Sequence, residues 1–179
     1  FDPAVEAAVG DMLAEIRADG DKALCKFARK YDGVSLSPAD FRVSAEEIEA
    51  AVNEMPAKVR TAIVRAHNQV RDFARQRLPE PWSYSPRKGV ILGERFAPLA
   101  RVGIYVPGGT APLVSSVLHT AALAAVAGVP EIVMVTPPRA DGSIHPALLA
   151  AGAEAGVTEC LRLGGVYGIG ALAFGTESV

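Results

Sequence analysis

The chain has 179 residues, of which 50% are hydrophobic, and its mean hydropathy is +0.22. This length suits one globular domain or two small ones. The formal net charge of −2 gives no reason to expect a nucleic acid or an anionic membrane as a partner. No apolar run is long enough to span a bilayer. The two cysteines, Cys25 and Cys160, are far apart and do not suggest a disulfide framework, so we expect a cytoplasmic protein.

The first 78 residues predict a series of helices. Asp2–Pro3 supplies an N-cap and a first helical residue for the first of them. Gly20 ends that helix, and Asp21 can cap the next. Ser44–Glu47 has the pattern of a capping box, so a third helix is expected from residue 45. The fourth helix is long and carries one apolar stripe, formed by Val59, Ile63, Ala66, Val70 and Phe73.

Two prolines then end the helical pattern, and residues 79–100 are mixed. The short stretches 89–92 and 94–96 predict the two strands of a hairpin. We place a domain boundary where helices give way to strand–helix alternation. Residues 1–100 are then a helical N-terminal region with a short hairpin, and residues 101–179 form a second unit.

The second unit alternates regularly between strands and helices. Residues 132–135 form a continuous apolar run, as expected of a parallel strand covered on both faces. Three successive β-α units predict the α/β class, with part of an incomplete Rossmann-like parallel sheet. The expected strands are 102–106, 131–136 and 159–163, and the expected helices are 115–127, 146–155 and 166–174.

The first strand of this unit ends in a glycine turn that favours ligand binding. Pro107 cannot donate to a strand ladder, and Gly108–Gly109 can adopt backbone angles closed to other residues. A turn of this kind, followed by a helix start, offers unpaired N–H groups to an anion. Ser115 and Ser116 lie at that helix start, where their hydroxyls could reach a phosphate or simply cap the helix.

The remaining polar candidates have plainer interpretations. His67 lies off the apolar stripe of its helix and is expected to face solvent, whereas His119 is expected to pack in the core. His145 precedes a proline and is expected to be an N-cap. The three histidines lack metal-ligand spacing. Residues 168–173 fit G-x-G-x-x-A inside a predicted helix, so we assign those glycines to close helix packing rather than to a dinucleotide fingerprint.

The order of motifs along the chain resembles the histidinol dehydrogenase family. The resemblance is carried first by the run Arg-Val-Gly-Ile-Tyr-Val-Pro-Gly-Gly-Thr-Ala-Pro at residues 101–112. It extends over essentially the whole chain, through the segments 20–24, 31–33, 116–118, 127–129, 136–138, 141–142, 164–165, 171–173 and 175–178.

This resemblance implies a function, a fold and partners. Histidinol dehydrogenases are NAD-dependent, zinc-requiring cytoplasmic homodimers that oxidise L-histidinol, a small amino alcohol, to L-histidine in histidine biosynthesis. Their fold has a helical N-terminal region and two incomplete Rossmann-like lobes. This chain corresponds to the N-terminal region and the first part of the nucleotide-binding lobe. It begins at Phe1 rather than at a methionine and stops at Val179 directly after a helical pattern, so we expect a fragment or a processed chain.

The resemblance also assigns cofactor-binding residues. Tyr105 corresponds to the family's NAD-contacting tyrosine and would lie along the cofactor, with the turn at residues 107–110 behind it. Tyr167 stands where the family has an NAD-contacting glutamine, and a phenol cannot offer both an amide donor and a carbonyl acceptor. The family's zinc ligands and its catalytic acid–base pair lie beyond residue 179. We therefore expect this chain to contain no catalytic residue and no metal ligand, and to be inactive alone.

Two other functions remain open. The Tyr167 difference is compatible with a paralogous NAD-dependent dehydrogenase of another small polar alcohol. A truncated, non-catalytic binding or assembly module is the third possibility. Such a module would carry an open sheet edge and would be prone to pair with another chain.

Overall fold

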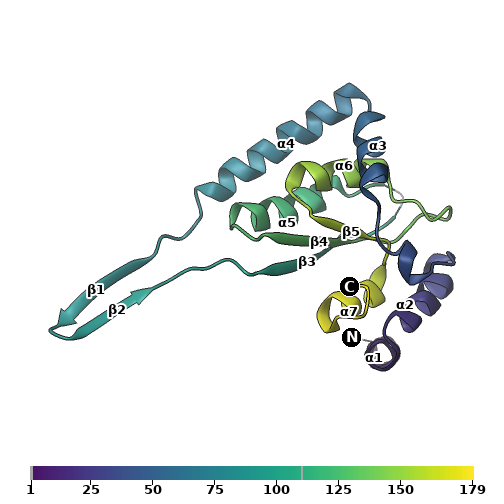
Figure 1. Ribbon diagram of the computed structural model, residues 1–179, viewed down its shortest axis with the longest axis horizontal. Coiled ribbons are helices and arrows are strands. Elements are labelled where there is room, and N and C mark those ends of the chain that lie inside the picture. The colour runs from purple at the N-terminus through teal and green to yellow at the C-terminus, as the bar shows by residue number, and fades with distance from the viewer. Residues whose placement is uncertain (1, 110) are drawn as a thin grey trace.

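The protein is an α/β structure in which helices cover both faces of a small parallel sheet (Figure 1). The computed structural model describes residues 2–109 and 111–179. Its helices are α1 (Pro3–Asp19), α2 (Asp21–Phe27), α3 (Ala45–Asn53), α4 (Ala57–Arg75), α5 (Val114–Val126), α6 (Pro146–Ala155) and α7 (Gly165–Phe174), with a π-helical turn η1 (Ala28–Asp32) and a 3-10 turn η2 (Pro38–Asp40). Its strands are β1 (Trp82–Arg87), β2 (Val90–Glu94), β3 (Arg101–Tyr105), β4 (Glu131–Val135) and β5 (Glu159–Leu161). The alternation of helices with parallel strands confirms the predicted α/β class.

The central sheet has the order β3-β4-β5, and all three strands run parallel. Tyr105 is paired with Val135, and Val135 with Leu161, so the carboxyl ends of the three strands lie at one edge of the sheet. The helices that connect parallel strands return the chain to the opposite edge. Loops that follow the three strands are therefore brought together, and this edge is where a ligand site is expected in an open α/β sheet.

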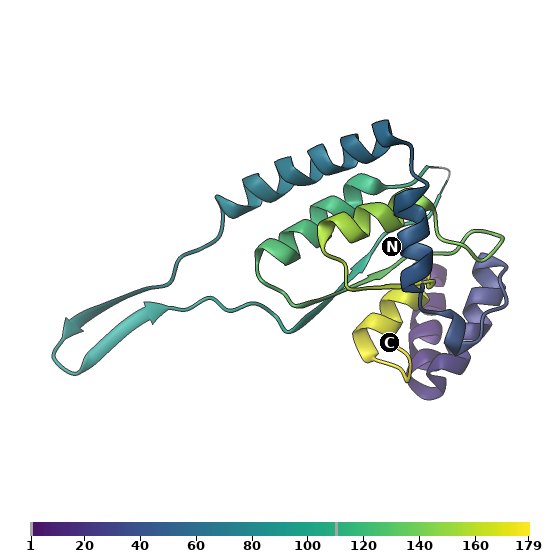
Figure 2. The same cartoon turned by 45° about the horizontal axis from the view of Figure 1, so that its top comes forward.

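Successive residues of β4 point to opposite faces of the sheet, as the period of a strand requires. Ile132 and Met134 join one buried cluster with residues of α3, α4, α5 and α6. Val133 and Val135 join a second cluster with residues of α1, α2 and α7. The result is a sheet between two helical layers (Figure 2). The expected division at residue 100 stays a prediction, but residues from both sides of it contribute to both clusters.

The two edges of the sheet differ. The extended segment before α3 covers the edge of β5: the N–H of Val43 donates to the carbonyl of Cys160, and the N–H of Arg162 donates to Phe41, each over 2.8 Å. In the described ranges β3 pairs only with β4, so its other edge carries no neighbouring strand. Within residues 2–109 and 111–179, no helix combines the length and the apolar character needed to cross a bilayer.

An antiparallel hairpin, β1–β2, projects far from the body of the protein (Figure 1). The prediction of a hairpin was right, but its strands were placed wrongly. The turn falls at Gly89, whose φ of +81° favours glycine. Pro86 is accommodated within β1 because the register shifts between Tyr84 and Arg87. Gly93, expected at the turn, lies in β2 opposite Ser83.

The N-terminal helices begin as the sequence indicates. The side chain of Asp2 accepts from the N–H of Ala4, and Ser44 and Glu47 form the predicted capping box. One detail differs: the N-cap of α2 is Gly20, and Asp21 is the first helical residue. The carboxylate of Asp21 instead accepts from the hydroxyl of Ser178 over 2.5 Å.

Two histidine predictions were wrong. His67 is buried against α5 and α6, while Val59 and Phe73 of the predicted stripe are exposed. Ile63, Ala66 and Val70 of the stripe do pack against the core, and the last turns of α4 extend past the body toward the hairpin (Figure 1). His119, expected in the core, is exposed on α5.

Candidate functional site

The loops that follow β3, β4 and β5 meet at Pro137. A side chain on Gly108, in the loop after β3, would collide with the ring of Pro137. A Cβ on Gly164, in the loop after β5, would lie 2.6 Å from the Cβ of Pro137. These two glycines therefore allow three loops to pack more closely than any side chain would permit. The N–H of Val106 also donates to the carbonyl of Val135 over 2.9 Å, which extends the β3–β4 pairing to the edge of the site.

A cavity of about 580 Å³ opens beside this junction. Its volume lies within the range of small-molecule and cofactor sites, roughly 300–1,000 Å³. The lining comes from the loops after β3 and β4, from the starts of α6 and α7, and from the end of η1. Its chemistry-bearing side chains are Tyr105, Asp32, Arg139 and His145. The Nδ1 of His145 accepts from the N–H of Ala147 over 3.1 Å, which confirms its predicted N-cap role.

The two predicted cofactor residues occupy different environments. Tyr105 is half-buried at the end of β3, and it lines the cavity. Tyr167 is on the first turns of α7 with 1% of its surface exposed, and its ring lies 6.4 Å from that of Phe27. Tyr105 is therefore at the cavity, whereas Tyr167 lies in the hydrophobic core next to it. The predicted contact of each residue with NAD stays a prediction.

The link between Tyr167 and the cavity is Asp32. The hydroxyl of Tyr167 donates to Oδ2 of Asp32, which is the last residue of η1 and lines the cavity. Burial and this hydrogen bond raise the pKa of Tyr167, so the phenol remains protonated and donates. Burial raises the pKa of Asp32 as well, and the hydrogen bond from Tyr167 offsets part of that rise.

The start of α5 does not have the predicted side-chain cap. The N-cap residue is Leu113, which has no side-chain hydrogen-bonding group, and Ser115 is exposed. Thr110, which was expected behind the cofactor, lies outside the described residues. The glycines of α7 pack as predicted: a Cβ on Gly168 would lie 2.8 Å from the carbonyl oxygen of Leu163, and one on Gly170 would lie 2.8 Å from Ile16 of α1.

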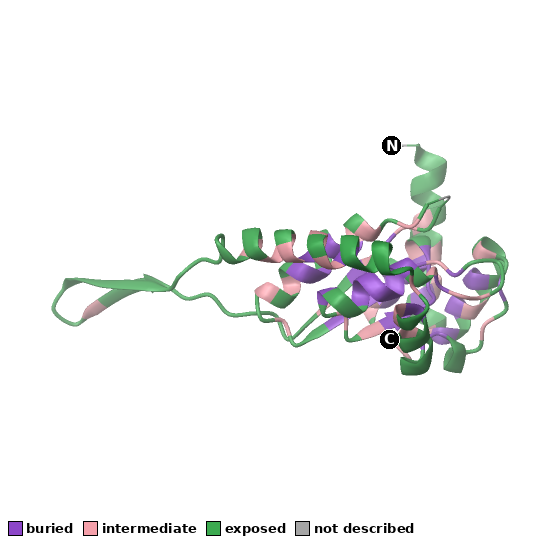
Figure 3. Ribbon diagram, turned by 90° about the horizontal axis from the view of Figure 1, so that it is seen from above, coloured by how far each residue is buried: buried purple, intermediate pink, exposed green. Residues whose placement is uncertain are grey.

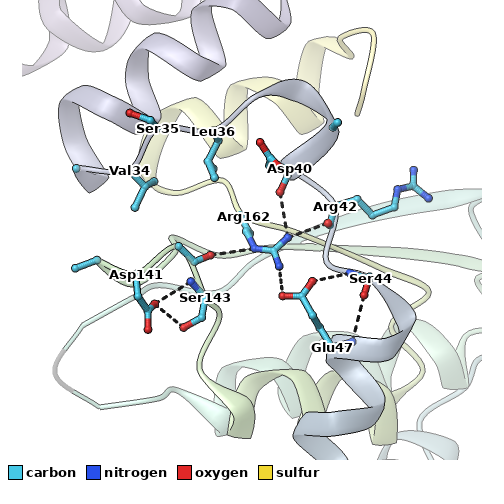
Figure 4. Close-up of a pocket in the computed structure, with 14 residues that line it drawn as sticks. Val34, Ser35, Leu36, Asp40, Arg42, Ser44, Glu47, Asp141, Ser143 and Arg162 are labelled. Atoms are coloured by element: carbon cyan, nitrogen blue, oxygen red, sulfur yellow. Dashed lines mark hydrogen bonds and ion pairs between the residues drawn. The ribbon is translucent and has the colours of Figure 1, made fainter.

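A second, more polar cavity of about 730 Å³ surrounds Arg162 (Figure 4). Arg162 is 8% exposed, and its guanidinium donates to the carbonyls of Gly142 (3.0 Å), Asp40 (3.0 Å) and Arg42 (2.8 Å), and to the carboxylate of Glu47. The hydrogen bond from Arg162 to Glu47 lowers the pKa of the Glu47 carboxyl. Because four protein acceptors already take its donors, Arg162 acts as a clamp that holds the segment before α3 against β5 and the β4–α6 loop.

Neither cavity has the composition of a metal centre. In the part of the chain that the structure describes, no three His, Cys, Asp or Glu side chains are grouped so that they could hold a metal ion. Asp141, at the rim of the second cavity, accepts from the N–H (2.9 Å) and the hydroxyl (2.6 Å) of Ser143 and so caps its own turn.

The sequence did not reveal Asp32 or Arg162 as parts of these cavities. Asp32 is noted from the sequence only within the segment 31–33 of the family resemblance, and its partner is 135 residues away. Arg162 lies within the predicted last strand, where its acceptors come from segments 20 and about 120 residues earlier. Local patterns carry no signal for such long-range pairs.

Comparison with known proteins agrees with the fold and with the motifs around β3. The sequence profile of the family described as histidinol dehydrogenase matches residues 2–179. The histidinol dehydrogenase of a Synechococcus species is 43% identical over 174 residues, which are 97% of this chain and 40% of that protein. The histidinol dehydrogenase of Caulobacter vibrioides is 47% identical over 175 residues, or 98% of this chain and 40% of that protein.

The solved structures give the same result. The crystal structure of histidinol dehydrogenase from Elizabethkingia anophelis superposes with a TM-score of 0.91 at 33% identity, over 98% of this chain and 40% of that one. The chain thus spans about two fifths of the length of these relatives. A profile match over residues 2–179, together with this likeness of fold, shows that the chain belongs to the histidinol dehydrogenase family.

Proposed function

We propose that this chain forms the NAD-binding part of an enzyme that oxidises L-histidinol to L-histidine in histidine biosynthesis. The observation that carries the proposal is the cavity at the carboxyl edge of β3 and β4, with Tyr105 in its wall. It occupies the position where open α/β sheets bind their ligands, and the chain around it matches the histidinol dehydrogenase family.

The residues of the cavity fit a dinucleotide. NAD, when bound, supplies a nicotinamide ring that accepts hydride from an alcohol carbon. Tyr105 offers an aromatic face on which a base or nicotinamide ring can stack. Gly109 also lines the cavity, and nothing lies within 4 Å of the place of its Cβ, so the backbone there is open to the close approach of a ligand. The packing of the three loops at Pro137 holds these groups in place and limits the entry of water from the sheet side.

The resemblance to histidinol dehydrogenases also implies zinc. The described residues of this chain do not provide a ligand set for it, so we derive no step through a metal. We propose that the zinc ligands and the acid–base residues belong to other parts of the enzyme, and that this chain alone does not turn over histidinol.

A second candidate function rests on Tyr167. In place of an amide that could bind NAD, this chain has a phenol whose hydroxyl is bound to Asp32. That difference favours a paralogous dehydrogenase acting on another small polar alcohol. The two candidates are distinguished by the alcohol that supports NAD reduction in the enzyme that contains this chain.

We also propose that the enzyme is a cytoplasmic homodimer. The hairpin β1–β2 supports the dimer, because all its residues are exposed except the half-buried Val90 (Figure 3). A lone two-stranded hairpin is marginally stable in water. Trp82, Tyr84 and Leu92, which is paired with Tyr84, are 51%, 54% and 48% exposed, and together they form an apolar surface suited to a protein contact. Free thiols at Cys25 and Cys160 support a reducing compartment.

The test of the cofactor proposal is calorimetric titration of NAD into this chain. We expect saturable binding that Tyr105→Ala weakens by about 10- to 100-fold, since aromatic stacking on one base contributes roughly 1–3 kcal/mol. Tyr84→Ala is the matched control, because Tyr84 is an exposed tyrosine on the projecting hairpin and should not affect binding. Far-UV circular dichroism establishes that each variant is folded. Equal affinity of wild type and Tyr105→Ala, or no binding by the folded chain, would contradict the proposal.

A further inference from the structure

The carboxylate of Asp32 is held in one orientation at the wall of the Tyr105 cavity. Its Oδ2 accepts the hydroxyl of Tyr167, which is fixed in the hydrophobic core with 1% of its surface exposed. The absence of a side chain on Gly164 makes room for it, because a Cβ there would lie 3.0 Å from Oδ2. A buried phenol and a close glycine thus determine where the carboxylate points.

The other oxygen of Asp32 is available to a ligand. Among the described residues, the hydrogen bond from Tyr167 is the only side-chain bond to this carboxylate, and no cationic group forms an ion pair with it. Oδ1 is not among the described side-chain atoms that are buried without a partner, so it retains exposed surface, and Asp32 is a lining residue of the cavity. Burial raises the pKa of Asp32, which indicates that the ionised group is incompletely solvated and would gain from a further donor.

The charges of the lining restrict what that donor can be. Asp32 is the one carboxylate among the described lining residues, and Arg139 is the one permanent cation. A phosphate is repelled by Asp32 and attracted to Arg139, whereas a sugar hydroxyl can donate to a carboxylate at no electrostatic cost. Carboxylates bind the ribose hydroxyls of dinucleotides in this way in related α/β folds.

We propose that Asp32 accepts a hydrogen bond from a ribose hydroxyl of NAD and that Tyr167 is its positioning residue. This inference rests on the proposed cofactor site. It gives the tyrosine at position 167 a role that differs from that of the glutamine in the family pattern: it acts on the cofactor through Asp32 instead of touching it. Asp32 is then a specificity-determining residue for ligands that carry a ribose.

The test is a titration of NAD, and of NAD analogues in which one ribose lacks its 2′- and 3′-hydroxyls, into wild type, Asp32→Asn and Tyr167→Phe. We expect Asp32→Asn to weaken NAD binding by about 10-fold, as for loss of a charge-assisted hydrogen bond. In wild type, one of the two dideoxy analogues should bind about 10-fold more weakly than NAD, and in Asp32→Asn this difference should nearly vanish. A purely structural effect of the substitution would weaken NAD and the analogue equally.

The positioning role of Tyr167 is tested by additivity. If it acts through Asp32, the double variant Asp32→Asn/Tyr167→Phe should bind NAD about as weakly as Asp32→Asn alone, whereas independent effects would multiply. Asp141→Asn is the control, because Asp141 caps an exposed turn at the other cavity and should leave NAD affinity unchanged. Melting curves establish that Tyr167→Phe remains folded.

The outcomes separate the two proposals. NAD binding that depends on Tyr105 but is unchanged in Asp32→Asn would overturn the role of Asp32 and leave the cofactor site standing. Equal affinity of wild type for NAD and both dideoxy analogues would overturn it as well. No NAD binding by folded wild type would overturn both.

Discussion

Glycine-to-alanine substitutions in α1 and α7 test the packing of the helical layer beneath the Tyr105 cavity. Each of Gly10, Gly168 and Gly170 lies inside a helix and none has positive φ. Alanine is favoured over glycine in a helix interior by about 1 kcal/mol. Any departure from that gain must therefore come from what the added methyl group meets, and the three sites differ in that respect.

The atoms around each added Cβ predict an order of stability for the three variants. Nothing lies within 4 Å of a Cβ on Gly10, so Gly10→Ala should stabilise the protein by about 1 kcal/mol. At Gly170 the obstacles are the ends of the Ile16 and Leu13 side chains, at 2.8 and 3.0 Å, which can rotate, so the net effect should be near zero. At Gly168 the obstacle is the backbone of Leu163 at 2.8 Å, which cannot rotate away. Overpacking costs about 1–3 kcal/mol, from which the helix-propensity gain of about 1 kcal/mol is subtracted, so we expect a net loss of about 1 kcal/mol.

The assay is urea denaturation and thermal melting followed by far-UV circular dichroism. For a chain of this size, 1 kcal/mol corresponds to a shift in Tm of roughly 2–4 °C. Gly10→Ala should therefore raise Tm by about 2–4 °C, and Gly168→Ala should lower it by about 2–4 °C. A Gly168→Ala variant as stable as Gly10→Ala would refute the packing of α7 against the β5–α7 loop.

Three further predictions follow from charge, burial and exposure. Arg162 lowers the pKa of Glu47, so this ion pair stabilises the fold at neutral pH, above the pKa of Glu47 in the unfolded chain, and the stabilisation is lost as the pH falls through the pKa in the folded protein. Glu47→Gln should cost only about 1 kcal/mol near pH 7, because Glu47 is 46% exposed. The difference in Tm between this variant and wild type should shrink, not grow, below about pH 4. Burial raises the pKa of Cys160 to about 12, so Ellman's reagent should modify Cys25 and spare Cys160 in the native protein, and rapid reaction of both would contradict this burial. If the hairpin forms the dimer contact, Trp82→Ser should weaken dimerisation in sedimentation equilibrium, and an unchanged dimer would assign the contact elsewhere.

Sequence reasoning identified the features that depend on local chemistry. The helix at 146–155 was predicted with the bounds the structure gives it, because His145, Pro146 and Gly156 mark its ends. The apolar run in β4 indicated a strand covered on both faces, and Ile132 and Val133 do face different helical layers. Hydrophobic periodicity and helix caps depend on residues close together in the sequence, so they predict these elements without knowledge of the tertiary fold.

The errors and omissions concern contacts between distant segments. The burial of His67 depends on how α4 packs against α5 and α6, which its own helix does not reveal. The hairpin strands depend on a register shift that tolerates Pro86. Asp32 and Tyr167 are each ordinary in their own segment, and only the fold brings their oxygen atoms together. The sequence therefore predicts the edge of the sheet as a site, and the structure supplies the carboxylate in its wall.

The central claim is that NAD binds in the cavity at the carboxyl edge of β3 and β4. Hydrogen–deuterium exchange with and without saturating NAD tests it most directly, because it locates bound ligand along the backbone. We expect slower exchange in peptides that cover residues 104–109 and 136–139, with residues 42–47 beside Arg162 unchanged. Protection confined to the Arg162 cavity, or none at either place when NAD is shown to bind, would contradict it.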